Sequence, residues 1–595
     1  MALPSRERGR AGDRIGGAVL NPGVKSILRE FWRHRGKVVL GLVCLLVVDA
    51  AQLTIPLVVK AVVDRLADAS AAVPWIGEQA LVLLGLACVV ALFRFAWRHF
   101  FFSASRLVEL DLRNRILDHV MGLSARYFTG TRTGEVMALA TNDVESVRQA
   151  IAMGFVAGFD ASIYALVAIA AMLWLDPVLA LWTILPLPFL ALLMAASLKA
   201  IYDRWDRVQA SFEGLTEKVR ESVTGIRVLR AYAQEDGDVE DFDRHSRDYY
   251  DKYMHYVKID ALFHPAILLL AGTCVAILLG VGGARVMEGR TSIGSFVAFT
   301  SYLGMLTWPM IAAGWMLSLV QRASASMDRI DALLKNDDVE DDRPAPTGTR
   351  IEGGIEVRSL DFAYPGQAEP ALKGISFSVH AGGSLGLVGE VASGKSTVAQ
   401  LLCRMYDPPA GTIFLDGHDA LDLPSDFLRA HIAYVPQEAF LFSDTVAENL
   451  RLGKPDATPE EMATACRLAA LHDEIGQLPK GYETLLGERG ITLSGGQKQR
   501  LCLARALLKP APILLLDDTL SAVDAETERD ILARLKAEAS RRTTVVISHR
   551  ASAVRDLDRI LCLQRGRVVQ SGTHEEMVRQ EGFYKIIVEL QEMEK

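Results

Sequence analysis

The sequence has few cysteines and no excess of basic residues, and both shortages exclude classes of protein. Its seven cysteines in 595 residues occur singly, and none has a CxxC spacing. This excludes a zinc knuckle or a disulfide framework and favours a reducing compartment. Lys and Arg number 64 against 72 Asp and Glu, for a formal net charge of −8. Proteins that coat nucleic acid carry a strongly basic face, so no nucleic-acid partner is expected.

Long apolar runs are absent after residue 335, whereas the preceding part of the chain is rich in them. Six apolar stretches are each long enough to cross a bilayer core of roughly 30 Å: 38–63, 79–102, 151–175, 177–199, 263–286 and 295–320. An acidic, proline-containing segment without periodicity follows and is typical of a linker. We therefore predict an all-α membrane domain with six spans at 1–334, a linker at 335–352 and a second domain at 353–595. The lipid bilayer is the first predicted partner.

The basic residues between the spans predict the orientation of the chain. Segment 66–79 has no Lys or Arg, whereas 103–150 and 203–260 are rich in both. The positive-inside rule then places the N-terminus, both long loops and the C-terminal domain in the cytosol, with the spans in the cytoplasmic (inner) membrane. Residues 24–35 are expected to form an interfacial helix, and helical spacing in both loops predicts that the spans continue as helices. Prolines inside spans are expected to kink them: Pro56, Pro186, Pro188, Pro265 and Pro309.

Three charged residues lie inside the predicted spans. At 1.5 Å per helical residue, Asp49, Arg94 and Asp160 come out at one depth, roughly 21–22 Å below the outer ends of their spans. Charges at such positions are costly and therefore worth a functional hypothesis. One interpretation is a structural ion pair or exposure to a water-filled vestibule, and the other is a polar patch that contacts substrate. The sequence leaves both open.

The second domain begins with a phosphate-binding pattern. An apolar strand leads into G-x-x-x-x-G-K-S, from Gly389 to Ser396, and a helix follows. Glycines let backbone N–H groups wrap phosphates, Lys395 reaches the β and γ phosphates, and the Ser396 hydroxyl ligates magnesium. The apolar run APILLLDD predicts a strand ending in Asp517, which is placed to hold the metal through its water shell. ATP and Mg²⁺ are the predicted cofactors, on an α/β P-loop fold.

A glycine-rich turn opening a helix, ITLSGGQKQR at 491–500, lies about 100 residues after the P-loop. With this motif the chain resembles the ATP-binding-cassette (ABC) family, and its first 320 residues resemble the six-helix membrane domain of the exporters of that family. The resemblance covers nearly the whole chain and is closest to the multidrug-resistance type. It implies an ATP hydrolase coupled to transport, with amphiphilic small molecules, drugs or lipids, as substrates.

The resemblance also implies roles for single residues around ATP. Tyr364 would stack on adenine, Gln437 would contact magnesium at the interface with the membrane domain, and His549 would be the switch that senses the γ-phosphate. The P-loop positions expected to bind ATP are Gly389, Ser393, Gly394, Lys395, Ser396 and Thr397.

Other motifs of the family act between subunits or between domains. The signature Leu493, Ser494, Gly495, Gly496 and Gln497 would close over ATP bound by the opposite subunit, and Asp524 would contact the other site. Residues 487–490 resemble an exporter loop that touches the cytosolic helices. The segments Ala125–Gly130 and 225–235 would be the coupling helices that dock on nucleotide-binding domains.

The sequence departs from the family pattern at the catalytic position. Asp518 stands where the family usually has the Glu that activates water, and Val391 and Ala392 replace the usual Thr and Gly. The shorter carboxylate loses about 1.5 Å of reach, and a general base must lie within about 2.6–3.2 Å of its proton. This chain would therefore form a poor hydrolytic site while its intact signature serves a partner's site. A heterodimer with a homologous half-subunit carrying Glu is expected, and a slow homodimeric lipid flippase is the alternative.

The order of domains on the chain separates an exporter from other classes of protein that carry the same ATP-binding motifs. A soluble chromosome-maintenance ATPase would have a long coiled coil and no spans, and an importer would usually keep its ATPase on a separate chain. A gated channel or a regulatory subunit stays open, because an impaired catalytic site fits both. ATP-dependent uptake into inside-out vesicles would distinguish a pump from either.

Overall fold

The computed structural model describes residues 22–68, 73–340, 343, 348–487, 490, 492–539 and 542–593. The chain divides into two compact units. Met1–Met121 and Arg132–Asn336 form the first unit, and Gly122–Thr131 and Asp337–Lys595 form the second. A short segment inside the predicted membrane domain therefore packs with the C-terminal part of the chain.

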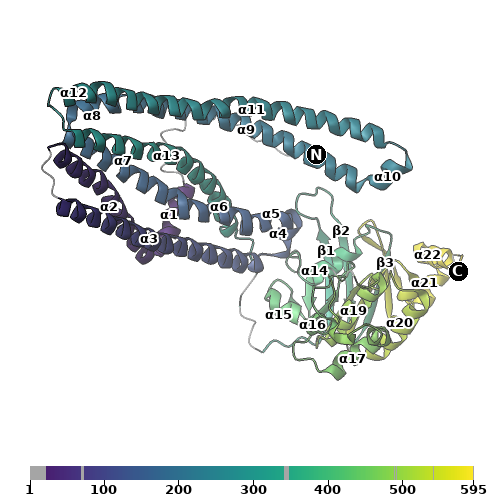
Figure 1. The fold of residues 1–595 in the computed structure, drawn as a ribbon. Helices are drawn as coiled ribbons and strands as arrows, with labels where there is room; N and C mark the ends of the chain where they lie inside the picture. The colour runs from purple at the N-terminus through teal and green to yellow at the C-terminus, as the bar shows by residue number, and fades with distance from the viewer. Residues whose placement is uncertain are drawn as a thin grey trace. The chain divides into compact units, whose positions relative to one another are not determined.

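The first unit consists of long helices (Figure 1). Three short π-helical turns interrupt two of the helical runs: Leu139–Asp143 and Ala150–Gly154 lie in one run, and Leu278–Gly282 lies in another. The helices are α1 (Pro22–Arg33), α2 (Arg35–Ala67), α3 (Val73–Gly122), α5 (Thr133–Ala138), α6 (Val144–Gln149), α7 (Phe155–Leu175), α8 (Pro177–Ile184), α9 (Leu187–Thr224), α10 (Ile226–Ala231), α11 (Glu235–Ile277), α12 (Gly283–Met287) and α13 (Ile293–Leu334).

The apolar parts of these helices coincide with the apolar stretches of the sequence. Among the described residues, three helical runs are long and apolar enough to cross a membrane: Arg35–Ala67, Val73–Gly122 and Thr133–Leu175. Shorter apolar helical runs occupy Pro177–Phe189, Gly272–Met287 and Ile293–Leu306. Each of these six runs overlaps one of the predicted spans.

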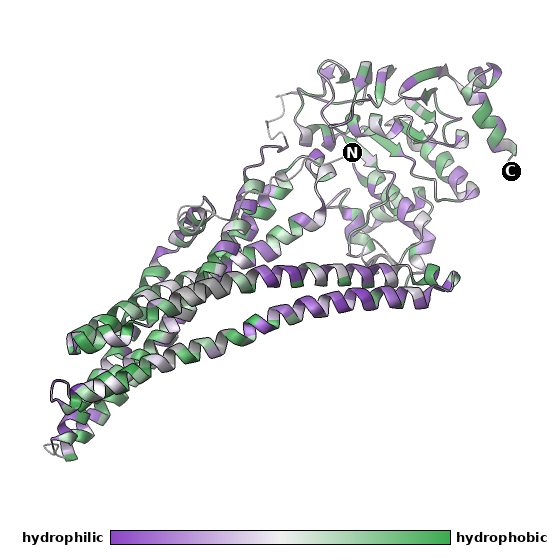
Figure 2. Cartoon of the chain, turned by 90° about the horizontal axis from the view of Figure 1, so that it is seen from above, coloured by the Kyte–Doolittle hydropathy of each residue, from purple (hydrophilic) through white to green (hydrophobic). Residues whose placement is uncertain are grey.

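Several helices continue well beyond their apolar part. Figure 2 shows α9 and α11 changing from hydrophobic residues at one end to hydrophilic residues near α10. The two helices pack along each other, and their polar parts are joined by side chains: Ser211 donates a hydrogen bond of 2.6 Å to Asp248, and Lys218 lies 2.8 Å from Asp238 and 3.0 Å from Asp241. Aromatic side chains also join the two helices there, since the rings of Phe212 and Tyr249 lie 5.6 Å apart between centroids.

The prolines of the predicted spans are accommodated within the helical runs of the first unit. Near Pro186 the helical hydrogen bonding is interrupted between α8 and α9, yet Leu185 (φ −51°, ψ −37°) and Pro186 (φ −73°, ψ −18°) keep helical dihedral angles. A proline has no N–H and clashes with the carbonyl four residues earlier, which explains the interruption. Pro56, Pro265 and Pro309 lie inside helices, and Pro188 lies in the first turn of α9.

The second unit contains two sheets and the helices around them. Among the described residues the strand orders are β2-β1-β4-β5 and β10-β9-β3-β8-β7-β6. The strands are β1 (Ile355–Phe362), β2 (Leu372–Val379), β3 (Ser384–Gly389), β4 (Ile413–Leu415), β5 (His418–Asp419), β6 (Ile432–Val435), β7 (Ile513–Asp517), β8 (Thr543–Ser548), β9 (Arg559–Gln564) and β10 (Arg567–Gly572). The helices are α4 (Ala125–Gly130), α14 (Lys395–Leu402), α15 (Ser425–Ala430), α16 (Val446–Arg451), α17 (Pro459–Leu468), α18 (His472–Gly476), α19 (Gly495–Leu508), α20 (Ala525–Ala539), α21 (His574–Arg579) and α22 (Phe583–Met593).

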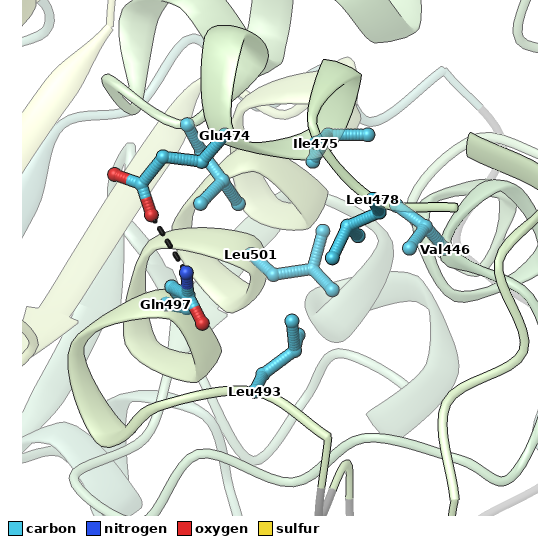
Figure 3. Close-up of a pocket in the computed structure, with 8 residues that line it drawn as sticks. Val446, Glu474, Ile475, Leu478, Leu493, Gln497 and Leu501 are labelled. Carbon is cyan, nitrogen blue, oxygen red and sulfur yellow. Dashed lines mark hydrogen bonds between the residues drawn. The ribbon is translucent and has the colours of Figure 1, made fainter. Parts of the chain in front are cut away.

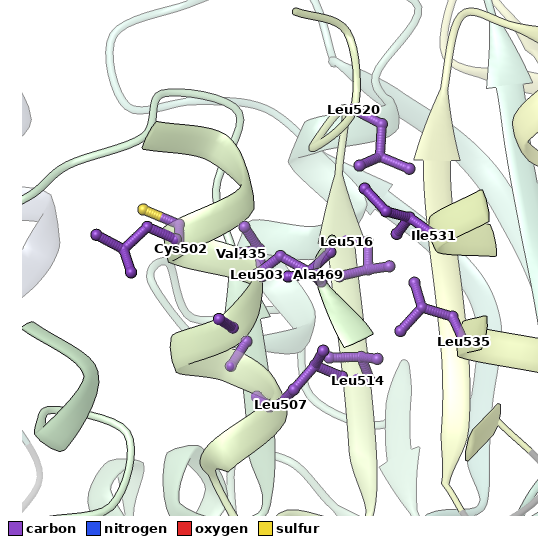
Figure 4. Packing of buried hydrophobic residues seen from close by; sticks show 14 of the residues in the cluster. Val435, Ala469, Cys502, Leu503, Leu507, Leu514, Leu516, Leu520, Ile531 and Leu535 are labelled. Atoms are coloured by element: carbon purple, nitrogen blue, oxygen red, sulfur yellow. The ribbon is translucent and has the colours of Figure 1, made fainter. Parts of the chain in front are cut away.

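The larger sheet places the carboxyl ends of its parallel strands at one edge. Strands β9, β3, β8, β7 and β6 pair in parallel, and β10 pairs antiparallel with β9. Every residue of β7 and β8 is buried, as expected for strands covered on both faces. In Figure 4, Leu503 and Leu507 of α19 pack beside Leu514 and Leu516 of β7. This packing attaches α19 to the sheet that carries the P-loop.

Candidate functional site

The loop from β3 to α14 depends on backbone conformations that side chains resist. Gly394 lies at φ +99°, and a Cβ on Gly389 would come within 2.2 Å of the Leu563 carbonyl oxygen. Ala392 lies at φ +63°, in the left-handed region that costs a non-glycine residue about 1–2 kcal/mol. The loop therefore adopts this conformation in spite of the alanine, at a cost in strain.

Lys395 begins α14 and turns back over its own loop. Its ammonium donates hydrogen bonds to the carbonyl oxygens of Gly389, at 2.8 Å, and Glu390, at 2.6 Å. Burial lowers the pKa of Lys395, and the carboxylates of Asp518 and Asp517 oppose that shift. The positive charge is thus held beside the backbone that would face a phosphate.

Asp517 ends β7 beside Ser396. The Ser396 hydroxyl donates to Asp517 Oδ1 at 2.9 Å, and the Tyr434 hydroxyl donates to Oδ2 at 3.4 Å. Burial raises the pKa of the Asp517 carboxyl, the hydrogen bond from Ser396 opposes the rise, and the neighbouring charge of Asp518 adds to it. A buried carboxylate next to a hydroxyl is an oxygen donor pair of the kind that Mg²⁺ prefers, so these residues fit the predicted metal.

Asp518 and His549 meet although 31 residues separate them. The Nδ1 atom of His549 lies 3.0 Å from Asp518 Oδ1, and the His549 side chain is about half exposed, at 47%. Asp518 lies at φ +46°, directly after β7. The His549 carbonyl oxygen accepts a hydrogen bond of 3.0 Å from Gln591. The imidazole is therefore held with one ring nitrogen on the carboxylate at the predicted catalytic position.

The predicted adenine-stacking residue lies beside the same helix. The Tyr364 hydroxyl is 2.9 Å from Thr397 Oγ1 and donates to Gln400 Oε1 at 2.9 Å. The Tyr364 ring also lies edge-on to Tyr406, with centroids 5.1 Å apart. Gln437 is exposed in the loop that follows β6, the strand next to β7. The P-loop, Tyr364, Asp517, Asp518 and His549 thus surround the carboxyl ends of β3, β7 and β8.

The signature motif forms the start of α19. Ser494 is the N-cap, and it forms a capping box with Gln497 in which each side chain accepts a hydrogen bond from the backbone N–H of the other residue. A Cβ on Gly496 would come within 2.9 Å of the Ala522 carbonyl oxygen. Within the described part of the chain, no hydrogen bond runs directly from the signature residues to the P-loop. The residues predicted around ATP therefore form two separate groups.

Asp524 has a local structural role in addition to its predicted one. Its carboxylate accepts hydrogen bonds from the backbone N–H groups of Glu526, at 3.2 Å, and Thr527, at 3.0 Å, at the start of α20. Gln499 of α19 accepts a hydrogen bond of 3.0 Å from the Ala522 N–H. The loop that carries Asp524 is thereby attached to the signature helix. In the loop 487–490, residues 488 and 489 lie outside the described residues.

The first predicted coupling segment is α4, which belongs to the second unit. Thr129 Oγ1 lies 2.9 Å from the Tyr406 hydroxyl. The Ser124 hydroxyl donates to Asp338 at 2.8 Å, and Glu340 forms an ion pair of 3.1 Å with Arg429. The family resemblance indicated the segment, but no local pattern pointed to Tyr406, Glu340 or Arg429 as its partners.

The second predicted coupling segment contains α10, at the end of the α9 and α11 pair. Val228 is 61% exposed and Tyr232 is 75% exposed. Apolar side chains exposed at a helix end are free to contact another surface.

The three predicted charges inside the spans come together in the first unit. Arg94 and Asp160 line a cavity of about 710 Å³, and Asp49 is close enough to both to interact electrostatically. Asp49 is 2% exposed, and no described donor is in hydrogen-bonding geometry with its carboxylate oxygens. Aromatic residues contribute much of the remaining wall of the cavity: Trp97, Phe102, Tyr164, Trp308 and Trp315.

This geometry defines a P-loop ATPase domain on the same chain as a helical membrane domain, and comparison with known proteins gives the family. Residues 38–310 match the model of the ABC transporter transmembrane region, and residues 372–521 match the ABC transporter model. The multidrug resistance-like ATP-binding protein MdlA of Escherichia coli (strain K12) is 37% identical over 95% of this chain and 96% of its own length. The chain therefore belongs to the ABC transporter family, as an exporter with fused membrane and nucleotide-binding domains.

Further relatives include exporters named for drugs and for lipids. The probable multidrug resistance ABC transporter YheI of Bacillus subtilis (strain 168) is 37% identical, with 85% of this chain and 87% of the relative covered. The ATP-dependent lipid A-core flippase of Thiobacillus denitrificans is 36% identical over 86% and 87%. A solved bacterial Atm1-family ABC exporter with ATP bound superimposes with a TM-score of 0.76, at 28% identity over 94% and 98%. The predicted fold class and ATP-driven transport activity are confirmed.

Proposed function

We propose that this chain is one half of a heterodimeric exporter that moves amphiphilic small molecules, drugs or lipids, out across the cytoplasmic membrane. Its N-terminus and nucleotide-binding domain would lie in the cytosol, because the basic residues gather in the segments on that side. The proposal that the two ATP sites differ is supported by one observation, the combination of Asp518 with an intact signature on the same chain.

The two halves of the machinery would serve different ATP molecules. The P-loop, Tyr364 and His549 would hold nucleotide at this chain's own site, where Asp518 is a short base already hydrogen-bonded to His549. The signature would complete the site on the partner's P-loop, where a Glu would activate water. ATP would then be retained at one site and hydrolysed at the other.

Magnesium is proposed at Ser396, Asp517 and Gln437. The metal would supply positive charge that stabilises the phosphates during phosphoryl transfer. Ser396 and Asp517 already lie 2.9 Å apart, and Lys395 adds a fixed positive charge on the same loop. These residues orient the nucleotide and offset its charge, so the water-activating carboxylate is the component of the site that is deficient.

The substrate would occupy the cavity of the first unit. Its aromatic walls suit apolar rings and chains, and Arg94 and Asp160 in its lining suit a polar head. Asp49 is buried beside these two charges. Relatives named for multidrug export and for lipid A-core flipping support this substrate class. Closure of the nucleotide-binding domains would turn the cavity outward through the coupling segments, and hydrolysis at the partner's site would reset it.

The allocation of the two sites is tested with substitutions in this chain only, measured as ATPase of the assembled transporter. Asp518→Glu should raise the rate or leave it similar, because the longer side chain extends the reach of the carboxylate at a site that is already slow. Ser494→Ala should lower the rate by about 10²-fold, as loss of one transition-state donor does. Asp530→Glu, an exposed change of the same kind in α20, is the control. Silent Ser494 variants together with an Asp518→Asn variant that stops turnover would refute the allocation.

A further inference from the structure

The signature helix is oriented by a residue outside the motif. Gln497 uses its amide oxygen to accept the backbone N–H of Ser494, at 2.8 Å. Its amide nitrogen donates to Glu474 Oε2 at 2.8 Å (Figure 3). If the amide were rotated by half a turn, a donor would face the Ser494 N–H and an acceptor would face the carboxylate. Glu474 therefore selects the one amide orientation that completes the capping box.

The second oxygen of Glu474 reaches the next turn of the same helix. Arg500 donates to Glu474 Oε1 at 2.6 Å, and also to the carbonyl oxygens of Ala470, at 2.6 Å, and Gly496, at 3.3 Å. One carboxylate thus holds two side chains of α19, and one of these returns to a signature carbonyl. Burial tends to raise the pKa of Glu474, but hydrogen bonds from Arg500 and Gln497 outweigh it and lower the pKa.

Glu474 lies beside a small cavity with mostly apolar walls. It lies on α18, which packs against α19 and α16 around a small cavity of about 10 Å³. Apolar side chains from these elements and their flanks form the lining: Val446, Leu471, Ile475, Leu478, Leu493 and Leu501. All of them except Leu471 are labelled in Figure 3. Because Glu474 is hydrogen-bonded to Gln497 and Arg500, the position of α18 fixes the position of these two side chains at the start of α19.

We propose that Glu474 is a positioning residue for the ATPase reaction, holding Gln497 and Arg500 so that Ser494 and the signature glycines face the partner's nucleotide. This inference rests on the proposed function, because the signature must serve an ATP site. Glu474 touches no reacting atom; it acts through the amide of Gln497 and the guanidinium of Arg500.

An exchange of the two side chains tests the proposal in the full-length, assembled transporter. In Glu474→Gln, one carboxylate oxygen is replaced by an NH₂ group. The remaining oxygen cannot accept from both Gln497 and Arg500, so one of these donors faces the new N–H donor. In Gln497→Glu, two carboxylates face each other. In the double variant, the amide now at position 474 can donate to the carboxylate now at position 497 and accept from Arg500. That carboxylate also accepts the Ser494 N–H in a Ser-x-x-Glu capping box, so every hydrogen bond has a partner of the correct polarity.

We expect each single variant to lower kcat for ATP by about tenfold, with KM within about twofold, and the double variant to recover most of kcat. Asp473→Asn, one residue away and exposed, removes the same charge and should behave like the parent. A role in packing alone would lower the melting temperature of the singles and would not be rescued by the exchange. A parental rate in Glu474→Gln, or a double variant no better than the worse single, would overturn the inference.

Ser494→Ala, run in parallel, distinguishes failure of the inference from failure of the proposed function. If Ser494→Ala inactivates while Glu474→Gln does not, Glu474 has no positioning role and the allocation of sites stands. If Ser494→Ala is silent, the allocation itself is wrong.

Discussion

At the scale of single residues, the four cysteines of the second unit are buried: Cys403, Cys466, Cys502 and Cys562. Burial raises the pKa of Cys403 to about 12, that of Cys466 to about 11 and that of Cys562 to about 12, and it also raises the pKa of Cys502. The thiolate is the nucleophile, so a thiol with a raised pKa reacts slowly near neutral pH. Both the raised pKa and the lack of access act in the same direction.

We therefore expect a hydrophilic maleimide at pH 8 to modify none of these four cysteines in the folded transporter and all of them in denaturant. Peptide mass mapping gives the extent of modification at each position. Ala381→Cys, on an exposed turn, is the positive control and should label fully in the folded state. Labelling of Cys403 at the rate of the Ala381→Cys thiol would show that this core opens locally.

A site residue could be predicted from the sequence when it belongs to a motif of neighbouring residues. The P-loop and the signature are contiguous patterns, so the sequence alone was enough to predict Lys395, Ser396 and Ser494 as site residues. Glu474 is 23 residues from Gln497 and belongs to no pattern. Its role follows only from the packing of α18 against α19, which a single sequence does not display.

At the scale of elements, α4 is held on the second unit by the linker as well as by the nucleotide-binding domain. Glu340 accepts from the Ala125 N–H at 3.3 Å and pairs with Arg429. Ser124 N–H donates to the Asp338 carbonyl oxygen at 2.8 Å. The linker was predicted as an aperiodic segment, and its hydrogen bonding to α4 could not be predicted because both partners lie on irregular backbone far apart in the sequence.

If α4 transmits the closure, loosening this attachment should separate hydrolysis from transport. We expect Glu340→Gln to lower the amount of substrate moved per ATP by about twofold to fivefold, while ATPase itself changes less. The modest size follows because partly exposed ion pairs contribute roughly 1 kcal/mol or less. Parallel transport and ATPase assays in proteoliposomes measure the ratio. Glu369→Gln, which removes an exposed pair with Lys373, is the control, and equal ratios in the two variants would contradict a role for Glu340.

Three helices, α2, α3 and α7, each contribute one charge to the cluster beside the cavity. A single charge without a partner in such surroundings is strongly destabilising, whereas opposite charges together are tolerated. We expect Arg94→Asp and Asp160→Arg each to lose substrate uptake by about tenfold or more, and the double exchange to restore most of it. Uptake into inside-out vesicles is the measurement, and Arg290→Asp, which reverses an exposed charge outside the cavity, is the control. Independent, additive losses in the double variant would exclude pairing and favour direct contact with substrate.

At the scale of the whole molecule, hydrophobic length and charge distribution predicted the order of domains, because a bilayer requires long apolar helices and a P-loop requires a strand and a helix around it. The extension of α9 and α11 followed from helical spacing. The inclusion of Gly122–Thr131 in the second unit did not follow, because α4 has six residues and no buried residue of its own. Its place is decided by partners such as Tyr406 and Asp338, which the neighbouring sequence does not reveal.

The proposed asymmetry of the ATP sites predicts the composition of the assembled protein. A chain with Asp518 and Ala392 in its own site and a complete signature gains most from a partner that has the reverse deficiency. We expect a second, homologous chain with Glu at the water-activating position to co-purify with this chain in equal amounts. Native mass spectrometry of the detergent-solubilised complex gives the ratio of the two chains, and peptide sequencing identifies the companion.

The isolated chain, prepared alone, should hydrolyse ATP at least about tenfold more slowly than the pair, because both of its composite sites would carry Asp518. Self-association of the isolated chain with rapid hydrolysis at both sites would contradict the heterodimer and leave the homodimeric flippase as the better description.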